Sequence, residues 1–246
     1  MNPQITLAVA GRVLTQIRRD HRTVAMLLVV PCLLITLLWW MFADLPGDLF
    51  DTFGPGLLAM FPFIVMFLVT SVTTLRERSS GTLERLLTMP LGKLDFLLGY
   101  AIAFGLLAAV QATLAVTVSV GLLGLDVTGP VWLLGVVAVA DAVLGAALGL
   151  LVSAFATTEF QAVQFMPAFV LPQFLLCGLL VVRDQLPSVL QPISDVLPLS
   201  YAVDAMNAVA AQTEPLGEAV PDLAVIALWI AGSLLLGSLT LRRRTP

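Results

Sequence analysis

The stretch VAMLLVVPCLLITLLWWMFA, residues 24–43, decides the kind of fold that this chain adopts. The stretch is uncharged, and it has the length of about 20 apolar residues that a helix needs to cross bilayer hydrocarbon roughly 30 Å thick. Trp39 and Trp40 lie near its end, and indole side chains favour the interface between membrane and water. The stretch therefore predicts a membrane-spanning helix.

Five further stretches have the same character: residues 54–75, 96–123, 131–155, 161–182 and 221–241. Each apolar stretch is too long and continuous for a strand of a transmembrane β-barrel, in which apolar and polar residues alternate over about ten residues. Of the 246 residues, 59% are hydrophobic and 11% are charged, whereas soluble domains carry about 25% charged residues. Composition thus excludes a soluble enzyme, a disordered chain and a disulfide scaffold. We expect an all-α membrane protein with six transmembrane helices.

Positive charges gather on one side of this six-span arrangement. Eleven of the 12 basic residues fall on that side: Arg12, Arg18, Arg19, Arg22, Arg76, Arg78, Arg85, Lys93, Arg242, Arg243 and Arg244. The other side holds Arg183 among many carboxylates. Lysine and arginine accumulate on the cytoplasmic side of membrane proteins. Both termini are therefore expected in the cytoplasm, with the chain in the plasma membrane.

Two segments outside the spans also have helical patterns. Residues 3–22 place aliphatic side chains on one face and arginines on the other, which predicts an amphipathic helix at the cytoplasmic interface. Two alternatives remain for that helix, a simple anchor or an elbow that also rests against a cytoplasmic partner. Residues 183–220 are too apolar for a solvated loop. We expect short external helices there that re-enter the outer leaflet.

The loop after the second span reads RERSSGTLERLLTMPL, residues 76–91. Residues 82–89 suit a short helix that ends at Pro90 and carries Leu83, Leu86 and Leu87 on one face. Leucine side chains on a charged loop are expected to be shielded from water, either by lipid or by a groove in a soluble partner. Composition alone favours contact of these leucines with lipid.

Two spans contain polar or small residues that bear on packing. Asp141 begins a ridge that continues with Gly145 and Gly149, a pattern of small residues that suits close helix contact. The carboxyl group belongs either to that packing face or to a pore. Residues 161–182 contain two prolines and three glutamines, among them Gln173. Such a helix is expected to face protein rather than lipid.

Motifs for catalysis are missing from the sequence. His21 is the single histidine, so a paired-histidine metal site is impossible. A P-loop ending at Gly92-Lys93 would need glycine at position 87 and Ser or Thr at position 94, and both positions are leucine. We therefore predict no catalytic residues, no metal, no cofactor in this chain and no binding of nucleic acid.

Residues 76–104, RERSSGTLERLLTMPLGKLDFLLGYAIAF, resemble the stretch after the second span in type-2 ABC exporter permeases. The family pattern there is a charged cluster, then G-T-L-E, a leucine pair and a proline. The matching positions are Gly81, Thr82, Leu83, Glu84, Leu86, Leu87 and Pro90. Residues 197–206, LPLSYAVDAM, are similar to a second family signature in the external re-entrant region. The closest likeness is to drug-resistance permeases of the daunorubicin type, in bacteria.

The resemblance implies a half-transporter that works with other subunits. Two copies of the permease would form the pathway, and two separate ATPase subunits would bind Mg-ATP and hydrolyse it. The resemblance assigns residues 82–89 as the coupling helix, the segment that contacts the ATPase. Leu83, Leu86 and Leu87 would then fill a groove of the ATPase, so the resemblance reverses the preference for lipid. Glu77 and Glu84 would pair with basic residues of that partner.

The first and fifth spans would form the dimer seam and the wall of the pathway, as they tend to do in this family. The residues expected to meet a hydrophobic, drug-like or lipid-like cargo are Phe165, Met166, Phe169, Gln173 and Phe174. The implied function is multidrug export and antibiotic resistance. Three alternatives remain: a permease for lipid-linked polysaccharide, an ion-coupled secondary transporter that uses Asp141, and an accessory membrane subunit.

Overall fold

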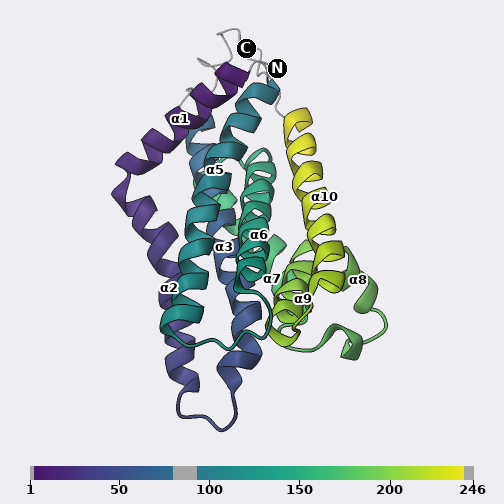
Figure 1. The fold of residues 1–246 in the computed structure, drawn as a ribbon. Helices are drawn as coiled ribbons and strands as arrows, with labels where there is room; N and C mark the ends of the chain where they lie inside the picture. The colour runs from purple at the N-terminus through teal and green to yellow at the C-terminus, as the bar shows by residue number, and fades with distance from the viewer. Residues whose placement is uncertain (1–2, 80–92, 241–246) are drawn as a thin grey trace.

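The computed structural model describes residues 3–79 and 93–240 (Figure 1). These residues form helices and contain no strand. In chain order, the elements are α1 (Pro3–Arg19), α2 (His21–Phe42), α3 (Leu49–Ser79), α5 (Lys93–Val116), the π-helix η1 (Thr117–Leu122), α6 (Val131–Ser153), α7 (Glu159–Leu176), the 3-10 turn η2 (Arg183–Gln185), α8 (Gln191–Val196), α9 (Pro198–Ala211) and α10 (Leu216–Thr240). The all-α prediction is confirmed.

Among the described residues, five helical segments are long and apolar enough to cross a membrane: α2, α3, α5 continued by η1, α6 and α10. Helix α7, which was expected as the fifth of six spans over residues 161–182, is not among them. It has 18 residues, begins with Glu159 and ends at Leu176. Its glutamines and prolines lower its mean apolarity. The chain then turns at Gly178, whose φ of 91° is a conformation that glycine adopts without strain.

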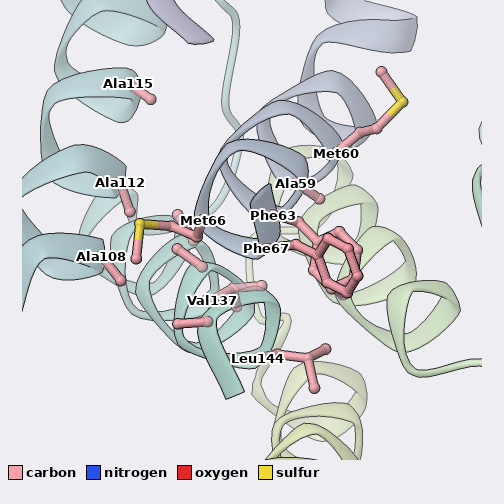
Figure 2. Packing of buried hydrophobic residues seen from close by; sticks show 14 of the residues in the cluster. Ala59, Met60, Phe63, Met66, Phe67, Ala108, Ala112, Ala115, Val137 and Leu144 are labelled. Atoms are coloured by element: carbon pink, nitrogen blue, oxygen red, sulfur yellow. The ribbon is translucent and has the colours of Figure 1, made fainter. Parts of the chain in front are cut away.

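Helices α3 and α6 form the centre of the molecule and run in the same direction (Figure 1). The other helices pack around this pair, and α2 and α10 leave most of their apolar surface uncovered. Figure 2 shows Phe63 and Phe67 one turn apart on α3, with Met66 directed toward the small residues Ala108 and Ala112 of α5. All five side chains are buried. Large residues on α3 therefore meet small residues on its neighbours, which lets the helices approach closely.

The predicted helix over residues 3–22 is divided at Asp20. The Asp20 carboxylate accepts hydrogen bonds from the Thr23 backbone N–H at 3.3 Å and from its hydroxyl at 2.7 Å, so it caps the start of α2. The buried face of α1 packs against α5 of the same chain. A Cβ atom on Gly99 of α5 would lie 2.6 Å from Cγ1 of Val9. Part of the apolar face of α1, including Val9 and Val13, is thus covered by protein, while Leu7 remains exposed.

Residues 183–220 form η2, α8, α9 and the first turn of α10. Helix α10 begins at Leu216, five residues before the predicted start of the sixth span at residue 221. Helix α9 packs against α3, α6 and α10, and the side chains of Leu199, Val203 and Met206 are fully buried. Contact with the helical bundle therefore accounts for the buried apolar residues of α9, whereas Val189 and Val196 of the same segment are exposed.

Four helix ends lie together at one end of the molecule: the start of α1, the end of α3, the start of α5 and the end of α10 (Figure 1). We call this end the loop end, because α3 ends and α5 begins there. The turn between α2 and α3 lies at the opposite end. The segment from η2 to α9 lies on the side away from the loop end.

Candidate functional site

The first candidate site is a charged contact at the loop end. Glu77 of α3 is buried, and its Oε2 atom accepts a hydrogen bond of 2.9 Å from Nη2 of Arg12 in α1. The same Arg12 nitrogen donates to the hydroxyl of Tyr100 in α5 at 2.9 Å. Glu77 was expected to pair with a base of a partner protein. The structure gives it a base of its own chain instead, because α1 folds back across α3 and α5.

A second charged contact lies beside the first. Nε of Arg76 donates to Oε1 of Glu159 at 2.9 Å, and Nη2 of Arg76 donates to Oε2 at 3.0 Å. Glu159 is the first residue of α7, so this two-point ion pair connects the end of α3 to the start of α7. Both side chains are about half exposed. The pair could not be predicted from the sequence, because the partners are 83 residues apart and Glu159 belongs to no motif.

The other residues assigned to the coupling helix lie outside the described residues. They are Gly81, Thr82, Leu83, Glu84, Leu86 and Leu87. The structure places the two stems of this loop, α3 and α5, side by side at the loop end (Figure 1).

The five residues assigned to the pathway do not share one surface. On α7, Phe165, Met166 and Phe174 are partly buried against the core, whereas Phe169 is 47% exposed. Gln173 is buried, and both ends of its amide are used within the chain. Its Nε2 donates to the carbonyl of Phe169 at 3.0 Å, and its Oε1 accepts from the backbone N–H of Leu199, at the start of α9, at 3.3 Å. Gln173 therefore joins α7 to α9.

The five α7 residues line neither of two hollows that lie among the described residues. An apolar groove of about 560 Å³ lies between α2, α5 and η1. Its lining residues include Cys32, Thr36, Trp40 and Val118. A polar cavity of about 810 Å³ lies between η2, α8, α9 and α10, with Arg183 and several carboxylates on its wall.

The small residues of α6 form the seam with α3. A Cβ atom on Gly145 would lie 2.5 Å from the carbonyl oxygen of Phe63, and one on Gly149 would lie 2.6 Å from that of Phe67. Asp141, one turn earlier on the same ridge, is fully buried. Its two carboxylate oxygens have no hydrogen-bond partner in the part of the chain that the structure describes. Asp141 lines neither of the two hollows described above.

Arg183 organises the segment from η2 to α9. Its Nε donates to Oγ of Ser194 at 3.0 Å, and its two terminal nitrogens donate to Asp195 and Asp204. The guanidinium also lies over the ring of Tyr201, 5.2 Å from its centroid. Ser194 in turn donates to the carbonyl of Leu176 at the end of α7, at 2.7 Å. One arginine thus joins three helices.

The chain can now be compared with known proteins. Residues 4–210, from α1 to the last turn of α9, match the family described as ABC-2 type transporter. The chain belongs to the ABC-2 type transporter family. This finding confirms the resemblance drawn from the loop after the second span.

Relatives within the ABC-2 type transporter family include multidrug permeases. The probable multidrug ABC transporter permease YbhR of Escherichia coli strain K12 is 29% identical over 150 residues, which cover 61% of this chain and 41% of YbhR. The probable multidrug ABC transporter permease YbhS of the same strain is 27% identical over 154 residues, covering 62% of this chain and 41% of YbhS. ABC transporter G family member 20 of Dictyostelium discoideum is 26% identical over 157 residues, covering 64% and 22% of the two chains. The chain spans about two fifths of the two bacterial relatives.

Membership in the ABC-2 type transporter family makes this chain a membrane transport component. Among the described residues, no group of three His, Cys, Asp or Glu side chains is arranged to hold a metal ion. The structural features described so far are the charged contacts at the loop end, the exposed face of α7 and the segment held by Arg183.

Proposed function

We propose that this chain is the permease of an ATP-driven exporter that moves drug-like or lipid-like amphiphiles out of the cell. Two copies form the pathway, and two separate ATPase subunits supply the energy from Mg-ATP. The observation that carries the proposal is the family match over residues 4–210, together with relatives that are named multidrug permeases. The lack of a P-loop in the sequence supports hydrolysis on another subunit.

We further propose that the loop end faces the cytoplasm of a bacterial cell and that α7 is a sixth span. Eighteen residues extend about 27 Å at 1.5 Å per residue, close to the thickness of the hydrocarbon. The exposed amide of Gln164 is costly in lipid, but it is tolerated where another helix covers it. A second copy that packs on α7 and α2 would supply that cover, and residues 183–220 would form the re-entrant external segment.

The test of this function is reconstitution with a P-loop ATPase, which is first sought among the open reading frames that neighbour the gene of this chain. Proteoliposomes that contain both subunits should accumulate rhodamine 6G when ATP and Mg²⁺ are added, and ATP hydrolysis should require both proteins. Accumulation of the dye by the permease alone, driven by a proton gradient, would instead support the ion-coupled alternative.

We expect Leu86→Asp to separate the permease from the ATPase. An apolar anchor in a partner's groove typically contributes about 2 kcal/mol or more to binding, so affinity should fall at least about thirtyfold. The measurement is the amount of ATPase that co-purifies with a tagged permease, with membrane insertion checked in parallel. Leu45→Asp is the matched control, because Leu45 is 49% exposed in the turn between α2 and α3, at the end of the molecule opposite the loop end. Wild-type recovery of the ATPase with Leu86→Asp would refute the coupling assignment.

Phe169→Ala should change drug export by a moderate factor. About half of the Phe169 side chain is available to a ligand, so its removal should cost about 1 kcal/mol of apolar contact, or roughly fivefold in affinity. The measurement is resistance of cells to a panel of amphiphilic drugs, with drug-stimulated ATPase activity recorded beside it. Phe160→Ala serves as the control, since Phe160 lies in the first turn of α7 and is 72% exposed. Unchanged resistance to every drug would place the pathway on other helices.

A further inference from the structure

Two adjacent residues near the end of α3 form ion pairs with different helices. Arg76 pairs with Glu159 of α7, and Glu77 pairs with Arg12 of α1. Neighbouring residues on an α-helix point about 100° apart, so the two side chains leave α3 in different directions. The end of α3 is therefore a branch point that contacts an earlier helix and a later helix of the chain.

The branch through Glu77 is a firm contact. Its carboxylate is buried, and Nη2 of Arg12 donates to Glu77 and to Tyr100, so α1, α3 and α5 meet at one nitrogen atom. The ring of Tyr100 packs against that of Phe96 with 4.3 Å between centroids. Thr6 adds a second contact between α1 and α5, since its hydroxyl donates to Asp95 at 3.3 Å. These contacts hold α1 and both stems of the loop as one unit.

The branch through Arg76 has a different character. Exposed ion pairs contribute little to the stability of a folded protein. The two parallel hydrogen bonds between Arg76 and Glu159 nevertheless fix the direction of approach, because the planar guanidinium matches a carboxylate at two points. Glu159 also stands in the first turn of α7, where a negative charge is favoured by the helix dipole. The pair is suited to setting the position of α7 rather than to holding the fold together.

We infer that Arg76 is a positioning residue that makes the start of α7 follow the end of α3. This inference rests on the proposed function, in which the ATPase acts on residues 80–92 and α7 borders the pathway. When the end of α3 moves, the branch through Glu77 carries α1 and α5 with it, and the branch through Arg76 carries α7. Without the Arg76–Glu159 pair, the ATPase still docks and hydrolyses ATP, but α7 no longer follows.

Charge exchange tests this inference. The variants are Arg76→Glu, Glu159→Arg and the double variant that carries both changes, with Arg76→Lys to keep the charge and remove the two-point geometry. Each single variant should keep the melting temperature and the ATPase activity of the wild-type complex, while rhodamine 6G transported per ATP falls about tenfold, a common size for coupling between sites. Arg76→Lys should fall between the wild type and Arg76→Glu. The double variant should restore transport.

A distance measurement tests the same inference without ATPase or cargo. In a background with Cys32→Ala and Cys177→Ala, spin labels are attached at Met26→Cys of α2 and Phe160→Cys of α7, two positions that are well exposed. The distance distribution should broaden in Arg76→Glu and narrow again in the double variant. Unchanged distances in the single variants, or a double variant that restores neither readout, would overturn the inference. If the wild-type complex shows no transport that depends on ATP, the proposed function fails, and the distances alone decide whether Arg76 positions α7.

Discussion

The variant Gly145→Ala is expected to lose about 8 °C of melting temperature. The added methyl group would lie 2.5 Å from the carbonyl oxygen of Phe63, much closer than a carbon and an oxygen atom can approach. The obstructing atom belongs to the backbone of α3, so a change of rotamer cannot relieve the overlap and the two central helices must separate. Overpacking of this kind costs about 3 kcal/mol, and each kcal/mol shifts the melting temperature by about 2–4 °C in a chain of this size.

The matched control is Gly135→Ala in the same helix. No atom lies within 4 Å of the position that its Cβ would take, and alanine is a better helix former than glycine by about 1 kcal/mol. Gly135→Ala should therefore keep or raise the melting temperature. The measurement is the fraction of detergent-solubilised protein that stays monodisperse after heating. Equal stability of the two variants would show that α3 and α6 do not meet at this seam.

Gly149→Ala should resemble Gly145→Ala, because its Cβ would lie 2.6 Å from the carbonyl oxygen of Phe67. The two changes together should cost less than their sum. Once the helices have separated to admit one methyl group, the second finds part of the space already open, and residues that share one contact are not additive.

The apolar helices of this fold could be predicted from the sequence because a bilayer demands long runs without charge. Helices α2, α3, α5, α6 and α10 coincide with five of the six predicted stretches, although α3 continues beyond its apolar run at both ends and reaches from Leu49 to Ser79. Helix α7 is harder to recognise from the sequence as a membrane span. Its glutamines indicate contact with protein, but they also remove the continuous apolarity that makes a span recognisable from sequence.

The partners of individual residues could not be predicted. The spacing of Gly145 and Gly149 indicates a close helix contact, but it does not say that α3 is the other helix. The motif that contains Glu77 points toward an ATPase, whereas the fold of α1 brings Arg12 to that carboxylate. Such pairs depend on which helices become neighbours, and a single sequence shows periodicity along each helix without showing the packing between helices.

Arg183 has a structural role that the sequence did not indicate. In the expected six-span arrangement it is the single basic residue on the side that is rich in carboxylates, a fact that bears on orientation and names no partner. The structure shows that Arg183 binds Asp195 and Asp204 together and that its side chain is 18% exposed. The two carboxylates bind different nitrogens of one guanidinium, and all three residues line the polar cavity between η2, α8, α9 and α10.

We expect Arg183→Ala to lower the melting temperature by about 5 °C. The Arg183 side chain is 18% exposed, but those of Asp195 and Asp204 are 64% and 38% exposed, so the cost of removing the guanidinium, about 2 kcal/mol, lies between the costs for an exposed and a buried ion pair. Burial already raises the pKa of Asp204, and the hydrogen bond from Arg183 opposes that rise. Without the guanidinium, the fold holds two carboxylates near each other with no neutralising charge.

Asp204→Asn tests whether uncompensated negative charge causes the loss of stability expected in Arg183→Ala. In the Arg183→Ala background, this change removes one of the two carboxylates that have lost the guanidinium, so the double variant should be more stable than Arg183→Ala alone. In the wild-type background the same change breaks a charge-assisted hydrogen bond and should destabilise. Arg18→Ala is the control for loss of an arginine, because Arg18 is exposed on α1. If Asp204→Asn lowers stability equally in both backgrounds, then Arg183 acts through its contacts with Ser194 and the ring of Tyr201 rather than through charge.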